Sequence, residues 1–315
     1  MIELSDILAA RQSIAGRLHR TPMLSSSALG KETGTELYFK AELFQKTGSF
    51  KPRGALNRLR RLTDEEKKRG VITISSGNHA QGLAYASSML GTRATVVMPA
   101  ATPDHKVQAA RGYGAEVILH GTVQDLAAKC EEVQKARNLT LVHPFDDPFV
   151  IAGQGTLGLE VLEDIPEPDV VLVPIGGGGL ISGVATAIKG QRPQVKVIGV
   201  EPVGAPTMHR SLQQGTPAHL ENIDTIAEGL AAPFVGQLNL EHVQKYVDDV
   251  VLVSDQELVE ALRMILERCK VLTEPAGAAG FAALLFRKVG IPRGARVVCV
   301  LGGGNVDARR LRELL

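Results

Sequence analysis

The amino-acid sequence predicts an α/β fold with two parallel-sheet, three-layer domains, the smaller inserted in the larger. The first observation behind this prediction is that short apolar runs alternate with helical patterns along most of the chain. Such runs are typical of strands buried on both faces of a parallel sheet. The second is that polar or glycine-rich loops follow several of these runs, where parallel sheets bind ligands. The third is the length of 315 residues, which is more than one core comfortably serves.

The smaller domain is predicted at residues 69–146, where strands and helices alternate most regularly. Its strands are expected at 71–75, 94–98, 115–119 and 140–143, and its helices at 79–90, 103–111 and 122–137. Helical crossovers between neighbouring short strands favour parallel pairing.

The larger domain is predicted at residues 1–68 and 147–315. It opens with an amphipathic helix, and Ser254 with Glu257 forms a capping-box pattern that begins a later helix. Residues 202–240 carry scattered Gly and Pro and no regular pattern. Strands are expected at 36–40, 170–174, 195–200, 247–253 and 296–301, and helices after Pro52, at 149–162, 180–189 and 276–285, and at the C-terminus.

Composition excludes several function classes. Hydrophobic residues make up 44% and charged residues 22% of the chain, and 35 basic against 34 acidic residues leave a formal charge of +1. This balance indicates neither nucleic acid nor an anionic membrane as a partner. No apolar run approaches the roughly 20 residues of a membrane span or forms a signal-peptide core. Three cysteines without a C-x-x-C pair fit a reducing compartment, so we expect a soluble, cytoplasmic protein.

A lysine stands at the predicted start of a helix, in the segment Ser49–Ala55. Pro52 disfavours helical geometry at Lys51 and suits the first helical position itself, so Lys51 is expected just outside the helix. A desolvated lysine in such a place loses part of its preference for the charged form and becomes a usable nucleophile. A solvated lysine before a surface helix is the alternative that this segment alone leaves open.

Two loops have the composition of anion sites. Ser75-Ser76-Gly77-Asn78-His79 lies between a predicted strand and a helix, and helix N-termini with such side chains can hold a carboxylate. A plain N-cap loop is its alternative. Gly176–Gly179 also lies between a strand and a helix, where backbone N–H groups favour a single terminal phosphate. It matches neither G-x-x-x-x-G-K-[ST] nor G-x-G-x-x-G, and a tight turn is its alternative.

Two further motifs end predicted strands. Gly302-Gly303-Gly304-Asn305 follows the last strand and again allows close backbone approach. Glu201-Pro202 ends an earlier strand, and its carboxylate either binds a cation or caps a turn. The eight histidines show no H-x-x-x-H pair, which disfavours a zinc site.

Together and in this order, these motifs resemble the fold type II pyridoxal-phosphate enzymes, whose fold is tryptophan synthase β-like. Within them the resemblance is to the serine/threonine dehydratase and serine racemase branch. It covers nearly the whole chain. The matching segments are Ser49–Ala55, Ser75–His79, Gly176–Gly179, Glu201-Pro202, Thr225–Gly229, Thr273–Ala276 and Gly303–Asn305.

The resemblance implies roles for several of these residues. Lys51 would hold pyridoxal 5'-phosphate as a Schiff base and serve as general base, and Phe50 would pack against the ring. Asn78 would donate to the phenolic oxygen of the ring. The other implied cofactor contacts are Gly176, Gly177, Gly178, Gly179 and Gly302. The implied substrate contacts are Ser75, Ser76, Gly77, Asn78 and His79. Ser76 matches the residue that protonates the opposite face of the substrate in racemases, and so counts as a second catalytic candidate.

The chain departs from this family pattern at two positions. Gly302 stands where a Ser, Thr or Cys usually faces the pyridine nitrogen. At the cation site Glu201 and Ala205 match the racemases, but Thr207 replaces an Asp. A mono- or divalent cation is therefore left open. The last predicted helix is short, so we expect no regulatory domain of the kind that biosynthetic threonine deaminases carry.

The resemblance implies a threonine/serine ammonia-lyase that converts L-threonine to 2-oxobutyrate and ammonia, and L-serine to pyruvate and ammonia. The substrate would be a small hydroxy amino acid, and a homodimer or homotetramer is expected. Serine racemase and hydroxyaspartate dehydratase are alternatives within the family. A non-catalytic protein that binds a phosphate ligand is the alternative of a different class.

Overall fold

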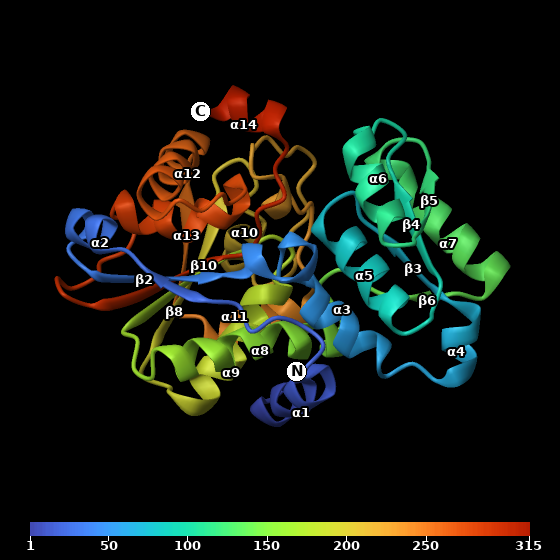
Figure 1. Ribbon diagram of the computed structural model, residues 1–315, viewed down its shortest axis with the longest axis horizontal. Helices are drawn as coiled ribbons and strands as arrows, with labels where there is room; N and C mark the ends of the chain where they lie inside the picture. The colour runs from blue at the N-terminus through green and yellow to red at the C-terminus, as the bar shows by residue number, and fades with distance from the viewer.

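A computed structural model describes residues 1–315 and shows two lobes, each built around its own sheet (Figure 1). The larger sheet has six strands in the order β1-β2-β10-β7-β8-β9. These strands span Met23–Ser25, Glu36–Ala41, Arg296–Leu301, Val170–Pro174, Lys196–Pro202 and Asp249–Val253, in that order. The smaller sheet has four strands, β5-β4-β3-β6. They span Glu116–Leu119, Ala94–Met98, Val71–Ile74 and Thr140–Leu141.

Helices cover both sheets, which gives each lobe its layers. The α-helices are α1 (Leu4–Ile14), α2 (Ser27–Thr33), α3 (Lys51–Leu59), α4 (Asp64–Arg69), α5 (Asn78–Met89), α6 (Asp104–Gly112), α7 (Leu126–Arg137), α8 (Pro148–Asp164), α9 (Gly179–Gln191), α10 (Thr207–Gln214), α11 (Gln237–Tyr246), α12 (Asp255–Cys269), α13 (Pro275–Leu285) and α14 (Ala308–Leu314). Short 3-10 turns are η1 (Glu42–Phe44), η2 (Lys46–Gly48), η3 (Val123–Asp125) and η4 (Glu228–Leu230). None of the helices combines the length and hydrophobicity that crossing a lipid bilayer requires.

The predicted α/β class is confirmed, and the strands of both sheets pair in parallel with one exception. That exception is β1, which the sequence pattern does not predict and which pairs antiparallel with β2. The strands of the smaller sheet fall within residues 69–146, the range predicted for the smaller domain, whose boundaries stay a prediction. Residues 202–240 are more regular than expected, because α10 and the start of α11 lie there.

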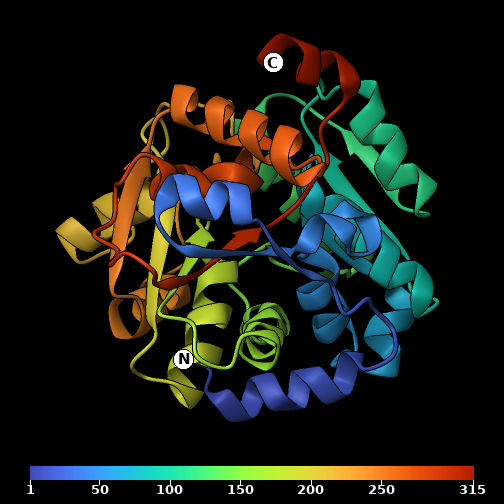
Figure 2. The same cartoon turned by 60° about the vertical axis from the view of Figure 1, so that its left-hand side comes forward.

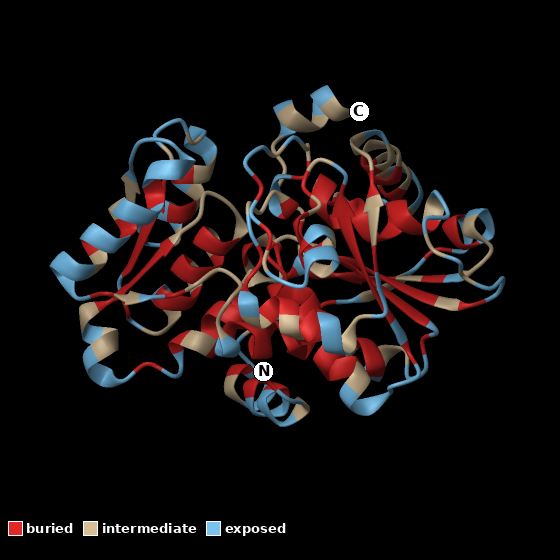
Figure 3. Ribbon diagram, turned by 180° about the vertical axis from the view of Figure 1, so that it is seen from behind, coloured by how far each residue is buried: buried red, intermediate tan, exposed pale blue.

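The larger sheet is buried on both faces (Figure 3). Alternate residues of β10 show this, since Val297 and Cys299 pack in a core with α12 and α13, whereas Val298 and Val300 pack on the other side with α9. Period-two alternation in a strand sends successive side chains to opposite faces. The continuous apolar runs of the sequence are the consequence of two covered faces.

Helix α3 joins the two lobes. Its Leu56 and Leu59 are fully buried in a core that they share with Leu83 of α5 and Val150 of α8. The helix begins at Lys51, one residue earlier than predicted, with Phe50 as the N-cap residue in helical geometry. Pro52 is then the second helical residue, which costs nothing because the N–H groups of the first turn have no partner within the helix.

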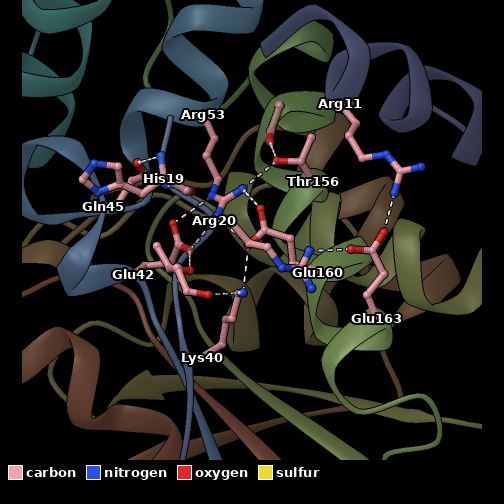
Figure 4. Close-up of polar contacts among 12 residues, drawn as sticks. Arg11, His19, Arg20, Lys40, Glu42, Gln45, Arg53, Thr156, Glu160 and Glu163 are labelled. Atoms are coloured by element: carbon pink, nitrogen blue, oxygen red, sulfur yellow. Dashed lines mark hydrogen bonds and ion pairs between the residues drawn. The ribbon is translucent and has the colours of Figure 1, made fainter. Parts of the chain in front are cut away.

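A buried ion cluster fixes the first turn of α3 (Figure 4). Arg53 is 2% exposed, and its guanidinium donates to both carboxylate oxygens of Glu42 at 2.8 Å and to Glu160 of α8 at 2.7 and 2.9 Å. Lys40 of β2 is fully buried and pairs with Glu160 at 2.8 Å. Planar two-pronged pairing of this kind suits arginine and no other cation.

The cluster supports a prediction about stability. Arg53→Ala would leave the fully buried carboxylate of Glu42 without its partner, so we expect the free energy of unfolding to fall by about 3–5 kcal/mol. Urea unfolding followed by circular dichroism measures the change. The matched control is Arg11→Ala, because Arg11 pairs with Glu163 on the surface, where such a pair contributes about 0–1 kcal/mol. Equal effects of the two substitutions would contradict the assigned role of the cluster.

Candidate active site between the two sheets

A cavity of about 1060 Å³ lies between the lobes, at the carboxyl ends of strands from both sheets. Parallel sheets bind ligands at this end, where loops and helix N-termini converge. The segments that line it include Phe50-Lys51, Ile74–His79, Gly176–Leu180, Glu228–Pro233 and Gly304–Asp307.

Lys51 is half-buried at the start of α3, and its Nζ donates to the carbonyl oxygen of Pro144 at 2.9 Å. Loss of water lowers the pKa of Lys51 to about 8, and the opposing effect of the carboxylate of Glu274 is smaller. Nζ also lies 5.1 Å from the ring centre of Phe50. At pH 7 about a tenth of this amine is therefore uncharged and nucleophilic, far more than for a free lysine with its usual pKa of 10.5.

The loop before Lys51 is held by the end of β10. Ser49 forms an isolated bridge with Gly303, and the N–H of Phe50 donates to the carbonyl of Gly302 at 3.1 Å. Thr47 adopts a φ of 65°, a left-handed conformation that a non-glycine residue adopts only where its surroundings enforce it. The side chain of Asn305 supplies part of that enforcement by donating to the Thr47 carbonyl at 2.8 Å.

The loop Ser75–His79 joins β3 to α5 at the cavity wall. The N–H groups of Ser76, Asn78 and His79 make no backbone hydrogen bond, as the N-terminus of a helix requires. Ser75 accepts the N–H of Gly77 at 3.2 Å. The imidazole of His79 is 2% exposed and directs Nε2 to the carbonyl of Val142 at 3.3 Å, so only its backbone N–H is available to an anion. Burial keeps the pKa of His79 well below its usual value.

The loop Gly176–Gly179 joins β7 to α9 in the same way. The N–H groups of Gly176, Gly177 and Gly178 donate to no backbone carbonyl. Gly178 has a φ of 97°, and a side chain on Gly177 would place its Cβ 2.3 Å from the ring of Phe145. Both positions therefore require glycine. The unpaired N–H groups at a helix N-terminus form a cradle for an anionic group.

Gly302 follows β10, next to the end of β7, on the wall that also carries Phe50. A Cβ built there would lie 3.6 Å from the Phe50 ring and 3.8 Å from Pro174, which is ordinary van der Waals contact. The absence of a side chain at this position is therefore not forced by crowding.

The residues predicted for a cation lie away from this cavity. Glu201 is fully buried, and its two oxygens accept the N–H groups of Met208 and His209 at 2.7 and 2.8 Å, at the start of α10. Burial raises the pKa of Glu201 to about 8, although these N–H groups act to lower it. Ala205 is also buried, and no group of three or more His, Cys, Asp or Glu side chains lies close enough together to hold a metal ion. A cation at Glu201 and Ala205 stays a prediction.

The sequence patterns assign no role to Glu274, which lines the cavity and accepts a hydrogen bond from Nδ2 of Asn78 at 2.8 Å. Glu274-Pro275 reads in the sequence as the start of a helix, and only the folded chain brings it to Asn78. Two polar contacts also cross from α6 to the larger lobe at the cavity mouth. Lys106 forms an ion pair with Glu228, and Nε2 of His105 lies 3.6 Å from a carboxylate oxygen of Asp307. Figure 2 shows the C-terminal segment passing close to the smaller lobe.

Comparison with known proteins agrees with this geometry. The family model "Pyridoxal-phosphate dependent enzyme" matches residues 14–303. The chain is 46% identical to an L-threonine ammonia-lyase of Thermotoga maritima, over 100% of this chain and 78% of that protein. It is 42% identical to the catabolic L-threonine dehydratase of Escherichia coli strain K12, over 99% of this chain and 96% of that protein.

Among solved structures, maize serine racemase superposes with a TM-score of 0.95 at 40% identity, covering 99% of this chain and 96% of the maize chain. The predicted resemblance is thereby confirmed along nearly the whole length. The chain belongs to the family of pyridoxal-phosphate-dependent enzymes, in the fold type II group that contains threonine ammonia-lyases and serine racemases.

Proposed function

We propose that the protein is a threonine ammonia-lyase that also accepts L-serine and uses pyridoxal 5'-phosphate. The observation that carries the proposal is a half-buried lysine in one cavity with two anion cradles, one on each lobe. One cradle suits a terminal phosphate and the other a carboxylate. The similarity to an L-threonine ammonia-lyase and an L-threonine dehydratase, which spans at least 99% of this chain, supports threonine as the substrate.

The residues present fit the cofactor. Gly176–Gly179 would hold its phosphate through backbone N–H groups, since the structure leaves those of Gly176, Gly177 and Gly178 without backbone partners. Lys51 would link to its aldehyde carbon. Phe50 and Gly302 would flank the ring on one wall, where the missing side chain at 302 leaves the pyridine nitrogen to another donor or to water. Asn78 would donate to the phenolic oxygen.

The chemistry would be elimination of the β-hydroxyl group. The bound cofactor supplies an electron sink that makes the α-proton of the amino acid acidic. The N–H groups of the Ser75–His79 loop, with Ser75 and Asn78, would orient the substrate carboxylate. Nζ of Lys51, displaced by the substrate amine, would take the α-proton as general base, which its lowered pKa favours at neutral pH.

Racemisation of serine is the second candidate. Ser76 lines the cavity with its hydroxyl free of protein partners, where it could exchange a proton with the face opposite to Lys51. The similarity to maize serine racemase gives this candidate its support. A protein that binds a phosphate ligand without catalysis has less support, because binding alone does not require a reactive lysine.

We further propose a homodimer or homotetramer that acts in the cytoplasm, with residues 69–146 as the inserted smaller domain. The assembly is implied by the family resemblance, and the compartment by three cysteines that form no disulfide in the chain.

One prediction tests the function itself. Purified protein with added cofactor should show a visible absorption band, which Lys51→Ala should abolish, because the band depends on the bond to Nζ. Addition of L-threonine should then yield 2-oxobutyrate, measured by a coupled dehydrogenase assay. Conversion of L-serine to D-serine without 2-oxo acid would favour the racemase. Absence of the band in the unaltered chain would favour the non-catalytic binding protein.

Another prediction concerns pH. Only the uncharged amine of Lys51 attacks the cofactor aldehyde, and its pKa of about 8 lies below the 10.5 of a free lysine. In cofactor-free protein, the rate of band formation should therefore rise about tenfold per pH unit below pH 8 and level off above it. Stopped-flow absorbance measures this rate. A rate that keeps rising to pH 10 would show that the amine of Lys51 is not desolvated.

The glycine loop supports a prediction about cofactor affinity. Gly177→Ala would force its Cβ into the ring of Phe145, so the N–H groups of the loop should move and cofactor affinity should fall at least about tenfold. Gly112→Ala is the control, because a Cβ at that position in α6 meets nothing within 4 Å. Equilibrium dialysis of the cofactor gives both dissociation constants. Unchanged affinity in Gly177→Ala would place the phosphate elsewhere.

A further inference from the structure

Glu274 occupies a position that its local sequence does not explain. It is the N-cap residue of α13, where an acidic side chain usually accepts an N–H of the first turn, yet its side chain makes no capping hydrogen bond. The carboxylate instead accepts Nδ2 of Asn78 at 2.8 Å and the backbone N–H of Asn305. The side chain thus reaches from the larger lobe to the first residue of α5 in the smaller lobe.

The amide of Asn78 is held from both ends. Nδ2 of Asn305 donates to the carbonyl oxygen of Thr47 at 2.8 Å and to Oδ1 of Asn78 at 2.7 Å. A carbonyl only accepts, so the Thr47 contact fixes which atom of Asn305 is nitrogen. The partner atom on Asn78 is then the oxygen, and Nδ2 of Asn78 faces Glu274, whose carboxylate also only accepts. The contact with Asn305 and the contact with Glu274 therefore require the same orientation of the Asn78 amide.

This arrangement leaves one donor unused. Nδ2 of Asn78 carries two hydrogens, of which Glu274 takes one, and the other has no acceptor in the protein. Asn78 lines the cavity together with Lys51. The unused N–H is thus held in place within the compartment that contains the reactive amine.

We propose that Glu274 is a positioning residue that, together with Asn305, fixes the amide of Asn78 so that its free Nδ2–H meets the phenolic oxygen of the bound cofactor. The inference rests on the proposed function, in which Asn78 makes that contact. A donor held in a fixed orientation favours the ionised form of the oxygen it meets. Glu274 thereby acts on the cofactor through Asn78, without touching it.

The charges around Glu274 come from several elements. Burial raises the pKa of Glu274 to about 7, and the hydrogen bonds from Asn78 and Asn305 lower it. Glu228 of η4 raises it, and Lys106 of α6 lowers it. Lys51 of α3 experiences the Glu274 charge in turn. An apolar side chain could fill this space without the free-energy cost of removing a carboxylate from water. Packing alone therefore does not explain a glutamate at this position.

The test compares cofactor-loaded variants by spectroscopy and affinity, both independent of turnover. We expect Glu274→Ala and Asn78→Ala to shift the pH midpoint of the visible band in the same direction and to weaken cofactor binding about tenfold each. The double variant should change the pH midpoint and the affinity no more than either single variant does, because both substitutions remove the same interaction.

Two further variants serve as controls. Glu274→Gln keeps an acceptor for Nδ2 of Asn78, so its pH midpoint and cofactor affinity should be closer to those of the unaltered protein. Glu260→Gln removes a surface carboxylate that pairs with Arg263 on α12, away from the cavity, and should leave the band unshifted.

Other outcomes would overturn the inference. If Glu274→Ala lowers the melting temperature while the band keeps its pH midpoint, Glu274 is only structural. Effects of Glu274→Ala and Asn78→Ala that add would show separate roles. Should Glu274→Ala not fold, Asn305→Ala removes the other anchor of the amide, and an unshifted band in that variant would equally contradict the proposal. Absence of any band in the unaltered protein would instead contradict the proposed function.

Discussion

The whole site depends on the paired charges beneath Arg53. The cluster joins β2, the turn after it and α8 to the first turn of α3, with every charge paired inside the protein. Because Arg53 stands two residues after Lys51, its immobilisation also holds the backbone from which the lysine side chain extends. Buried ion pairs add little net stability but strongly penalise any arrangement that separates them. Here that penalty maintains the position of a reactive group.

The two sheets contribute different parts of the cavity. The larger sheet supplies the glycine loop after β7 and the wall after β10, and the smaller sheet supplies the loop after β3. Each loop ends at a helix whose first N–H groups have no partner in the helix, and this requires no special side chain. The backbone therefore offers unpaired N–H groups at these helix starts, and the side chains of Lys51 and Asn78 line the same cavity. The fold thus places the N-termini of several helices around one cavity, and these helix starts form much of the site.

Sequence patterns predicted those parts of the molecule that depend on local order. Alternating apolar runs predicted nearly all strands, and Lys51 and the glycine loop, both selected by their local motifs, line the same cavity. The family resemblance was confirmed, whereas the roles of individual site residues stay predictions. The pattern could not show that Arg53 meets Glu160, which is 107 residues away, or that Glu274 meets Asn78, 196 residues away. Such contacts arise only from tertiary packing. The edge strand β1 has only three residues, too few for a periodic signal.

The place of β10 in the larger sheet has a consequence for synthesis on the ribosome. The last strand of the chain lies between β2 and β7, and its end holds the loop that carries Lys51. The smaller sheet, whose strands lie between residues 71 and 141, can form while the rest is still being made, because its contacts are near in sequence. The larger sheet must wait until residues 296–301 have left the exit tunnel. A nascent chain therefore carries Lys51 in an unfinished lobe, and the cavity between the two sheets is complete only when the last strand has paired.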